Sequence, residues 1–309
     1  MTRWFAFRPV AFVILALTCF AGVTHGETVT LRVMGWNVES GDADPEVIAD
    51  RIAGEDGIHV WGLSEVAGDD DAESYRKAAE VGESGRFEKI VGNTGGSDRL
   101  VILYDKDKLR FLSSQELDHI NVGGHVRAPL FARFKGKTTG QEFVFMVNHL
   151  YRSRASRRHQ QATLLNRWAR SQTVPVIAAG DYNFDWDLQT GDINHHNGYD
   201  NLTKDEVFIW VRPDVLEKAH ASDYNSVLDF VFVAGTASGW EAESTIVKVD
   251  GDFPDDDEKS DHRPVDCIFT FDTSTIDVTP PSLTKEEILE WIEQLEQQLE
   301  ELKAATERL

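Results

Sequence analysis

Cysteine is scarce in this sequence, with two residues among 309. Cys19 lies in an apolar segment near the N-terminus, and Cys267 lies in the apolar run at residues 265–271. With one cysteine outside the N-terminal segment, an internal disulfide of the globular part is excluded. Its stability must therefore come from a hydrophobic core, in which Cys267 is expected to be a small buried residue.

Positive charge is also in short supply. The chain carries 31 Lys and Arg against 53 Asp and Glu, for a formal net charge of −22. A surface this acidic repels nucleic acid on average and attracts divalent cations. One basic cluster, at residues 152–158, holds four Arg in seven positions. It can track a phosphate backbone or, in the alternative interpretation, form the solvated start of a helix.

The usual zinc-hydrolase motifs are missing. The sequence has no His–Cys cluster and no His-Glu-x-x-His helix, which disfavours a zinc hydrolase. His195 and His196 are adjacent, and adjacent side chains do not chelate from one face of a regular element. We interpret that pair as part of an exposed loop at residues 191–199.

Long apolar runs are absent except at residues 10–21. Arg3 and Arg8 precede this run and small residues follow it, so residues 1–26 are predicted to be a secretory signal peptide. The protein is then expected to be secreted or periplasmic. The run is short for a membrane span, so no stable membrane insertion is expected after cleavage. An uncleaved anchor is the alternative.

Apolar residues make up 41% of the chain and include 17 Phe and eight Trp, enough for a large core. Short apolar runs, several of them alternating, predict strands at residues 29–36, 59–64, 100–104, 129–134, 142–147, 174–179, 227–233, 245–249 and 265–271. Helices are predicted at residues 45–53, after the capping residue Asp44, and at 157–171. This mixture predicts one α/β or α+β domain over residues 27–271.

The C-terminal residues form a separate unit. Residues 272–281 are rich in Thr, Ser, Asp and Pro and are predicted to be a linker. Beyond it, apolar side chains alternate in steps of four and three, at Ile288, Ile292, Leu295, Leu299 and Leu302. This spacing predicts a coiled-coil helix at residues 282–309 and a homo-oligomer formed through it. The alternative is an amphipathic helix folded back on its own domain.

Polar residues that suit a metal site follow the predicted strands. They are Asn37, Glu65, His149, Asp181 with Asn183, and the SDHRP segment at residues 260–264. Each carries little weight alone, because such residues also form turns and strand ends. Together, the carboxylate and amide oxygens suit a hard cation such as Mg²⁺, and the imidazoles can transfer protons. The set therefore favours hydrolysis of a phosphate ester.

Six ordered motifs carry a family resemblance: Trp36-Asn37, Leu63-Ser64-Glu65, Asn148-His149-Leu150, GDYN at 180–183, LDFVF at 228–232 and SDHRP at 260–264. Over residues 28–271 the chain resembles the endonuclease/exonuclease/phosphatase superfamily, which includes pancreatic-type deoxyribonucleases and exonuclease III-like nucleases. The resemblance implies a four-layered α/β sandwich with two packed mixed β-sheets, and a metal-dependent site at one edge of the sandwich. An exported, bacterial-type member is expected.

The resemblance also implies roles for the metal ligands and the base. Glu65 is the expected main carboxylate ligand of Mg²⁺, with Mn²⁺ or Ca²⁺ as alternatives, and Asn37 lies beside it. Asp261 is expected at a second metal position. Asp181 is expected to position or activate the attacking water, supported by Asn183.

The remaining roles concern the imidazoles. His149 is expected to bind a phosphate oxygen, with Asp98 as its orienting acid. His262 is expected to contact the phosphate or transfer a proton, with Asp229 holding its ring. Gly95 and Gly96 stand where pancreatic-type deoxyribonucleases carry a Tyr, which puts their mode of contacting the DNA minor groove in doubt.

Three arginines are predicted to bind the substrate phosphate: Arg127, Arg154 and Arg157. The resulting hypothesis is an exported metal-dependent phosphodiester hydrolase that acts first on nucleic acid. A phosphatase or a lipid-headgroup phosphodiesterase is the alternative. A catalytically idle binding module displayed by the coiled coil is a further alternative of another class.

Overall fold

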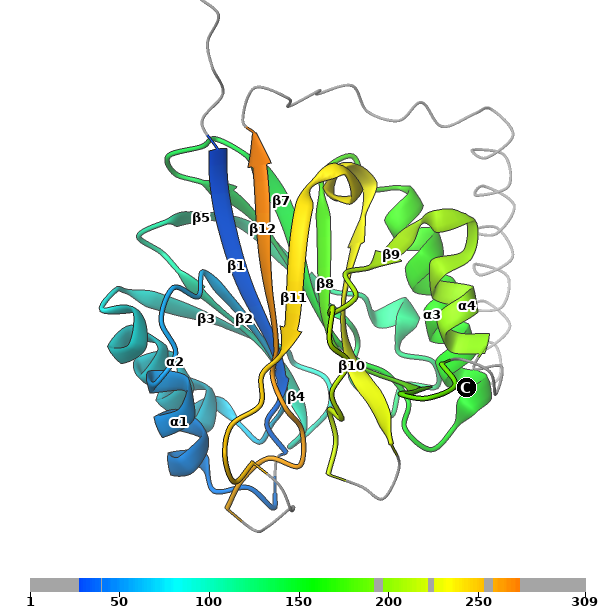
Figure 1. Cartoon of the computed structure of the whole chain (residues 1–309), viewed down its shortest axis with the longest axis horizontal. Coiled ribbons are helices and arrows are strands. Elements are labelled where there is room, and N and C mark those ends of the chain that lie inside the picture. Colours follow the sequence, from blue (N-terminus) through cyan, green and yellow to red (C-terminus); the bar gives the residue numbers. More distant parts are fainter. Residues whose placement is uncertain (1–27, 40, 192–196, 222–224, 253–257, 273–309) are drawn as a thin grey trace, which may run out of the picture.

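The computed structural model describes residues 28–272 except residues 40, 192–196, 222–224 and 253–257. Two six-stranded mixed β-sheets pack face to face, with helices on the outer face of each (Figure 1). The predicted four-layered α/β sandwich is thus confirmed. The predicted signal peptide, most of the linker and the coiled-coil helix lie outside the described residues. Among the described residues, no helix has the length and apolar character to cross a membrane.

The first sheet has the order β11-β12-β1-β2-β4-β3. Its strands are β1 (Thr28–Asn37), β2 (Val60–Val66), β3 (Phe87–Val91), β4 (Arg99–Asp105), β11 (Glu241–Ile246) and β12 (Val265–Asp272). Strands β1 and β2 are parallel and are joined through helix α1 (Pro45–Ala53). Helix α2 (Asp69–Glu83) follows β2, and both helices cover the outer face of this sheet (Figure 1).

The second sheet has the order β5-β6-β7-β8-β10-β9. Its strands are β5 (Leu109–Glu116), β6 (Leu130–Gly136), β7 (Glu142–His149), β8 (Val176–Asp187), β9 (Phe208–Trp210) and β10 (Ser226–Ala234). Strands β7 and β8 are parallel and are joined through helix α3 (Ala155–Arg170), which covers the outer face with α4 (Asn197–Thr203) (Figure 1). Short 3₁₀ helices lie at Asp118–Ile120, Lys204–Glu206 and Gly235–Gly239.

The two parallel strand pairs bring polar residues to one edge of the sandwich. Asn37 and His149 end β1 and β7, whereas Asp181 lies within β8, which continues to Asp187 and is longer than the strand predicted at 174–179. Asn37 pairs in register with Ser64, and His149 pairs with Asp181. Strands β4, β10 and β12 are antiparallel to these pairs, so they begin at the same edge. The loops before them therefore meet the ends of the parallel strands, which places the site.

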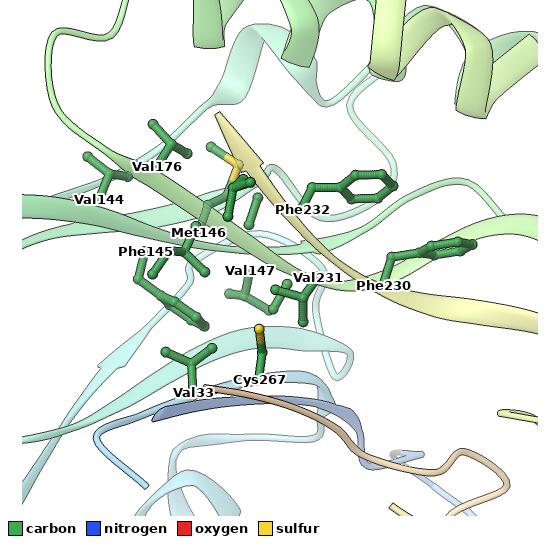
Figure 2. Close-up of a cluster of buried hydrophobic side chains, with 14 of the residues drawn as sticks. Val33, Val144, Phe145, Met146, Val147, Val176, Phe230, Val231, Phe232 and Cys267 are labelled. Atoms are coloured by element: carbon green, nitrogen blue, oxygen red, sulfur yellow. The ribbon is translucent and has the colours of Figure 1, made fainter. Parts of the chain in front are cut away.

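Apolar side chains fill the space between the sheets. Phe145, Val147 and Val231 from the second sheet point toward Val33 and Cys267 of the first (Figure 2). Cys267 is fully buried, as predicted. The sheets lie close together at Gly62, where an added Cβ atom would lie 2.9 Å from Cε1 of Phe145. Glycine is thus required there for packing.

We expect Gly62→Ala to lower the free energy of unfolding by about 1–3 kcal/mol, because an added methyl group overpacks this contact. Gly239→Ala is the control, since a Cβ atom at Gly239 would meet no atom within 4 Å. Urea denaturation measures both. Equal stability of the two variants would contradict the close approach of the sheets at Phe145.

Several elements differ from the sequence-based expectation. The strand predicted at 245–249 is wrong at its end, because β11 stops at Ile246. Helix α2 was not predicted, since its buried face consists mainly of alanine, at Ala72, Ala78 and Ala79. Strand β5 was not predicted either, because it is an edge strand exposed over most of its length and shows no alternation.

Candidate active site

Glu65 lies at an irregularity in β2. Its φ is +58°, and the register between β2 and β4 shifts between Leu63 and Val66. A positive φ is unfavourable for a glutamate, so the surrounding sheet must hold it. The Glu65 carboxylate accepts a hydrogen bond from Nδ2 of Asn37 at 2.9 Å. The bulge thus presents a partly exposed carboxylate at the end of the strand.

Asp181 is the buried carboxylate at the centre of the site. It follows Gly180, whose φ of +131° and contact with the carbonyl oxygen of Asn148 leave no room for a side chain. The backbone N–H of Asn183 donates to Oδ1 of Asp181 at 2.8 Å. Burial and the nearby Asp229 carboxylate raise the pKa of Asp181 to about 7. This residue can therefore exchange a proton near neutral pH.

His149 is the first imidazole and is neutral. Its Nε2 lies 3.3 Å from Oδ2 of Asp181. Burial and the adjacent guanidinium of Arg127 hold the pKa of His149 well below its usual value. Arg127 also pairs with Asp98 at 2.8 Å, whereas Asp98 lies 3.9 Å from His149. Asp98 therefore acts on His149 through Arg127 rather than by a direct hydrogen bond.

His262 is the second imidazole and is cationic. Its Nδ1 is 2.6 Å from Oδ2 of the buried Asp229. Burial opposes the charged ring, but Asp229 and Asp181 outweigh it and raise the pKa of His262 to about 10. The backbone is fixed as well, because Trp36 Nε1 donates to the His262 carbonyl at 2.9 Å. The imidazolium thus points at Asp181, with Nε2 at 3.9 Å from Oδ2.

The donor set fits a divalent cation. Glu65, His149 and Asp181 each offer a ligand atom, and these atoms all lie within 4.8 Å of one another. Mg²⁺ is usually bound by one or two carboxylates and completes its octahedral coordination with waters and substrate phosphates. Asn37 turns its Nδ2 toward Glu65 and Asp181, while its Oδ1 accepts the N–H of Glu39 at 3.0 Å. Metal ligation by the Asn37 oxygen would therefore need rotation of the amide.

A polar pocket of about 110 Å³ opens over these groups. It is lined by Glu39, Asp42, Glu65, His149, Arg152, Asp181, Asn183, His220, Leu228, Asp261 and His262. Of the basic cluster, only Arg152 lines the pocket. Arg154 precedes α3 as its exposed N-cap residue, and Arg157 donates to the hydroxyl of Tyr151 at 2.7 Å. The pocket therefore brings together Glu65, His149, Asp181, Asn183, Asp261 and His262 of the predicted residues, whereas Arg154 and Arg157 do not line it.

Five residues of the pocket were not predicted as site residues: Glu39, Asp42, Arg152, His220 and Leu228. Glu39 accepts the backbone N–H of Asp261 at 2.8 Å, and Arg152 provides a cation at the rim. His220 lies 2.8 Å from Asp261 and packs edge-on against His262, with ring centroids 4.5 Å apart. Glu39 and Arg152 could have been found from their positions directly after the Asn37 and His149 motifs. His220 follows no predicted strand, so no local signal marked it.

Known proteins share this fold. No curated protein sequence matches the chain. A crystal structure of an endonuclease/exonuclease/phosphatase family protein from Bacteroides thetaiotaomicron is 19% identical, with a TM-score of 0.59, over 80% of this chain and 97% of that one. The mannosyl-6-phosphatase of B. thetaiotaomicron VPI-5482 is 20% identical (TM-score 0.57; 78% and 100% covered). D. rerio TDP2 complexed with single strand DNA product is 18% identical (TM-score 0.57; 78% and 98% covered).

At these identities the solved structures establish the fold. The sequence itself supplies the stronger link, since the profile of one family matches residues 34–262. That range runs from within β1 to His262 and so includes every strand end that contributes to the pocket. The chain belongs to the Endonuclease/Exonuclease/phosphatase family.

Proposed function

We propose that this protein is a divalent-metal-dependent phosphodiester hydrolase and that nucleic acid is its principal substrate class. The observation that carries the proposal is the charge pattern around Asp181. Two imidazoles approach its Oδ2 atom, the neutral His149 at 3.3 Å and the cationic His262 at 3.9 Å. Such a pattern suits a negatively charged ester that is attacked by water and whose leaving group departs as an alkoxide, which then takes a proton from solvent.

The residues divide the reaction between them. Asp181 accepts the proton of the attacking water, which its pKa near 7 allows at neutral pH. The His262 imidazolium donates a hydrogen bond to a phosphate oxygen, and Asp229 fixes its ring. The neutral His149 binds a second phosphate oxygen. A cation held by Glu65, proposed to be Mg²⁺, would supply charge neutralisation of the phosphate.

Two observations bear on the substrate. Arg152 provides positive charge at the rim, next to a pocket whose other charged side chains are acidic or histidine, and the related D. rerio TDP2 structure holds a single strand DNA product. The pocket is small, however, at about 110 Å³, which suits a terminal phosphate group as well. A phosphomonoesterase is therefore the second candidate, in line with the mannosyl-6-phosphatase among the similar structures.

A substrate screen tests the proposal. Metal-stripped protein is incubated with plasmid DNA, single-stranded DNA, bis-p-nitrophenyl phosphate and p-nitrophenyl phosphate, each with Mg²⁺, Mn²⁺ or Ca²⁺. We expect cleavage of the diesters. Turnover of the monoester alone would favour the phosphatase, and no turnover of any ester would favour a binding module.

Removal of the metal is expected to abolish activity. When no cation is present, nothing offsets the repulsion between the carboxylates of the site and the negatively charged phosphate. Excess EDTA should reduce the rate to background, and added Mg²⁺ should restore it. Undiminished hydrolysis in EDTA, after dialysis against chelator, would contradict the metal dependence.

We also propose that the protein acts outside the cytoplasm after removal of residues 1–26. Arg3, Arg8 and the apolar run at residues 10–21 support this proposal. N-terminal sequencing of protein recovered from the periplasm or the medium would test it. An intact Met1 in recovered soluble protein would count against cleavage.

A further inference from the structure

The pocket holds a second group of ligand atoms that the proposed reaction does not use as a unit. His220, Asp261 and His262 present ligand atoms within 4.8 Å of one another. Nε2 of His220 lies 2.8 Å from Oδ2 of Asp261, and Nε2 of His262 lies 3.6 Å from Oδ1. The two imidazoles thus converge on one carboxylate from different loops.

The chemistry of this group differs from that of the Glu65 group. It offers two nitrogen ligands and one carboxylate, a set that suits Zn²⁺ and other transition metals better than Mg²⁺. Two atoms that bind Zn²⁺ at about 2.1 Å lie at most about 4.2 Å apart, so shifts of less than about 1 Å would complete the site. All three side chains are at least largely buried, with 8%, 15% and 5% exposure for His220, Asp261 and His262.

The surroundings orient His262 as a metal ligand. Histidines that bind metals usually donate their other ring N–H to a carboxylate, which fixes the tautomer and strengthens the ligand. Asp229 occupies that position, 2.6 Å from Nδ1 of His262. Nε2 is therefore the nitrogen directed into the pocket, toward Asp261.

We propose that His220, Asp261 and His262 form a binding site for a transition-metal cation such as Zn²⁺, and that an ion bound there inhibits the enzyme. Binding does not depend on the proposed function, whereas inhibition rests on it. A ligand imidazole must be neutral, so an ion at Nε2 displaces the proton through which His262 contacts the phosphate. Mg²⁺ at Glu65 and Zn²⁺ at this site would then have opposite effects.

Binding is measured first, without substrate. Metal-stripped full-length protein is titrated with ZnCl₂ by calorimetry, as wild type, His220→Gln and Asp261→Asn. Both variants are expected to bind Zn²⁺ at least about tenfold more weakly. The control is the His195→Gln/His196→Gln double variant, which removes the adjacent histidine pair and should bind as the wild type does. Loss of binding in the control, or equal affinity in all proteins, would overturn the site.

A spectroscopic measurement decides the site even if a ligand variant fails to fold. Zinc K-edge X-ray absorption of the control variant should show two imidazole ligands. The Glu65 group offers a single histidine, so one imidazole or none would overturn the proposal. In that case His220 serves only to orient Asp261 by its hydrogen bond.

Inhibition is measured second, as the ratio of the rates with and without Zn²⁺ at fixed Mg²⁺. The concentration for half-inhibition should rise at least about tenfold in His220→Gln. Zn²⁺ binding at the site without inhibition would overturn the inhibitory role alone. If the screen finds no hydrolysis at all, the proposed function fails while the calorimetric result still decides the site.

Discussion

Replacing Asp181 with Asn is expected to reduce the rate of phosphoester hydrolysis by about 10²–10⁴-fold, because the amide cannot accept the proton of the attacking water. The change preserves size and the hydrogen bond from the N–H of Asn183, which an amide oxygen also accepts. Steady-state kinetics at saturating Mg²⁺ measure the effect. Asp185→Asn is the matched control, since that exposed carboxylate lies four residues along β8 and should not matter.

The Asp181→Asn variant should be at least as stable as the wild-type protein. The pKa of Asp181 is raised from 3.8 to about 7 by burial and by Asp229, so the folded state favours the protonated form. Ionisation of this group therefore lowers the stability of the metal-free protein as the pH rises from about 4 to about 7. The Asn side chain carries no charge, so the melting temperature of the variant at pH 8 should equal or exceed that of the wild type. An inactive variant with a much lower melting temperature would indicate a structural rather than a chemical defect.

Replacing Asp229 with Asn is expected to lower the rate on the order of 10²–10⁴-fold and to change the pH profile. In the wild type, activity should rise as Asp181 loses its proton near pH 7 and fall as His262 loses its proton near pH 10. The Asp229→Asn change removes the negative charge that favours the imidazolium, so the alkaline limb should move to lower pH. Rates measured from about pH 5 to about pH 11 would show it.

The charged form of His262 stabilises the folded protein because it pairs with Asp229, whereas the charged form of Asp181 destabilises it; both contributions lower the stability as the pH rises. The pKa of His262 is raised from 6.5 to about 10, so its stabilisation is fully present below pH 6.5 and is lost as the pH rises through 10. Asp266→Asn is the control for the shift of the alkaline limb. Asp266 lies in β12 of the first sheet, pairs with Arg32 of β1 and does not line the pocket. An unchanged alkaline limb in Asp229→Asn would contradict the assigned cause of the raised pKa.

The arginines show which features of the site could be predicted from the sequence and which could not. Arg127 was predicted to bind phosphate, and the structure places it against His149 and Asp98, outside the pocket lining. Arg154 and Arg157 were selected for their charge and position, whereas Arg152 from the same cluster lines the pocket. Their phosphate-binding role stays a prediction. A run of residues shows that charge is present, but the direction of each side chain depends on how α3 begins.

The sequence by itself determined the strands that carry the site and the order of its polar residues. Asn37, Glu65, His149 and Asp181 each end or interrupt a buried apolar strand, and such periodicity is a local property of the chain. It also determined helix α1, where the Asp44 side chain accepts the N–H of Glu46 as an N-cap.

Only the tertiary structure decided the charge of each histidine and the position of His220 in the pocket. His149 and His262 look alike in sequence, yet burial beside Arg127 keeps one neutral and burial beside Asp229 makes the other cationic. His220 meets Asp261 because its loop, which has no strand pattern, forms an isolated antiparallel β-bridge with the segment at His262. Burial and charge are summed over residues far apart along the chain, and no local pattern contains that sum.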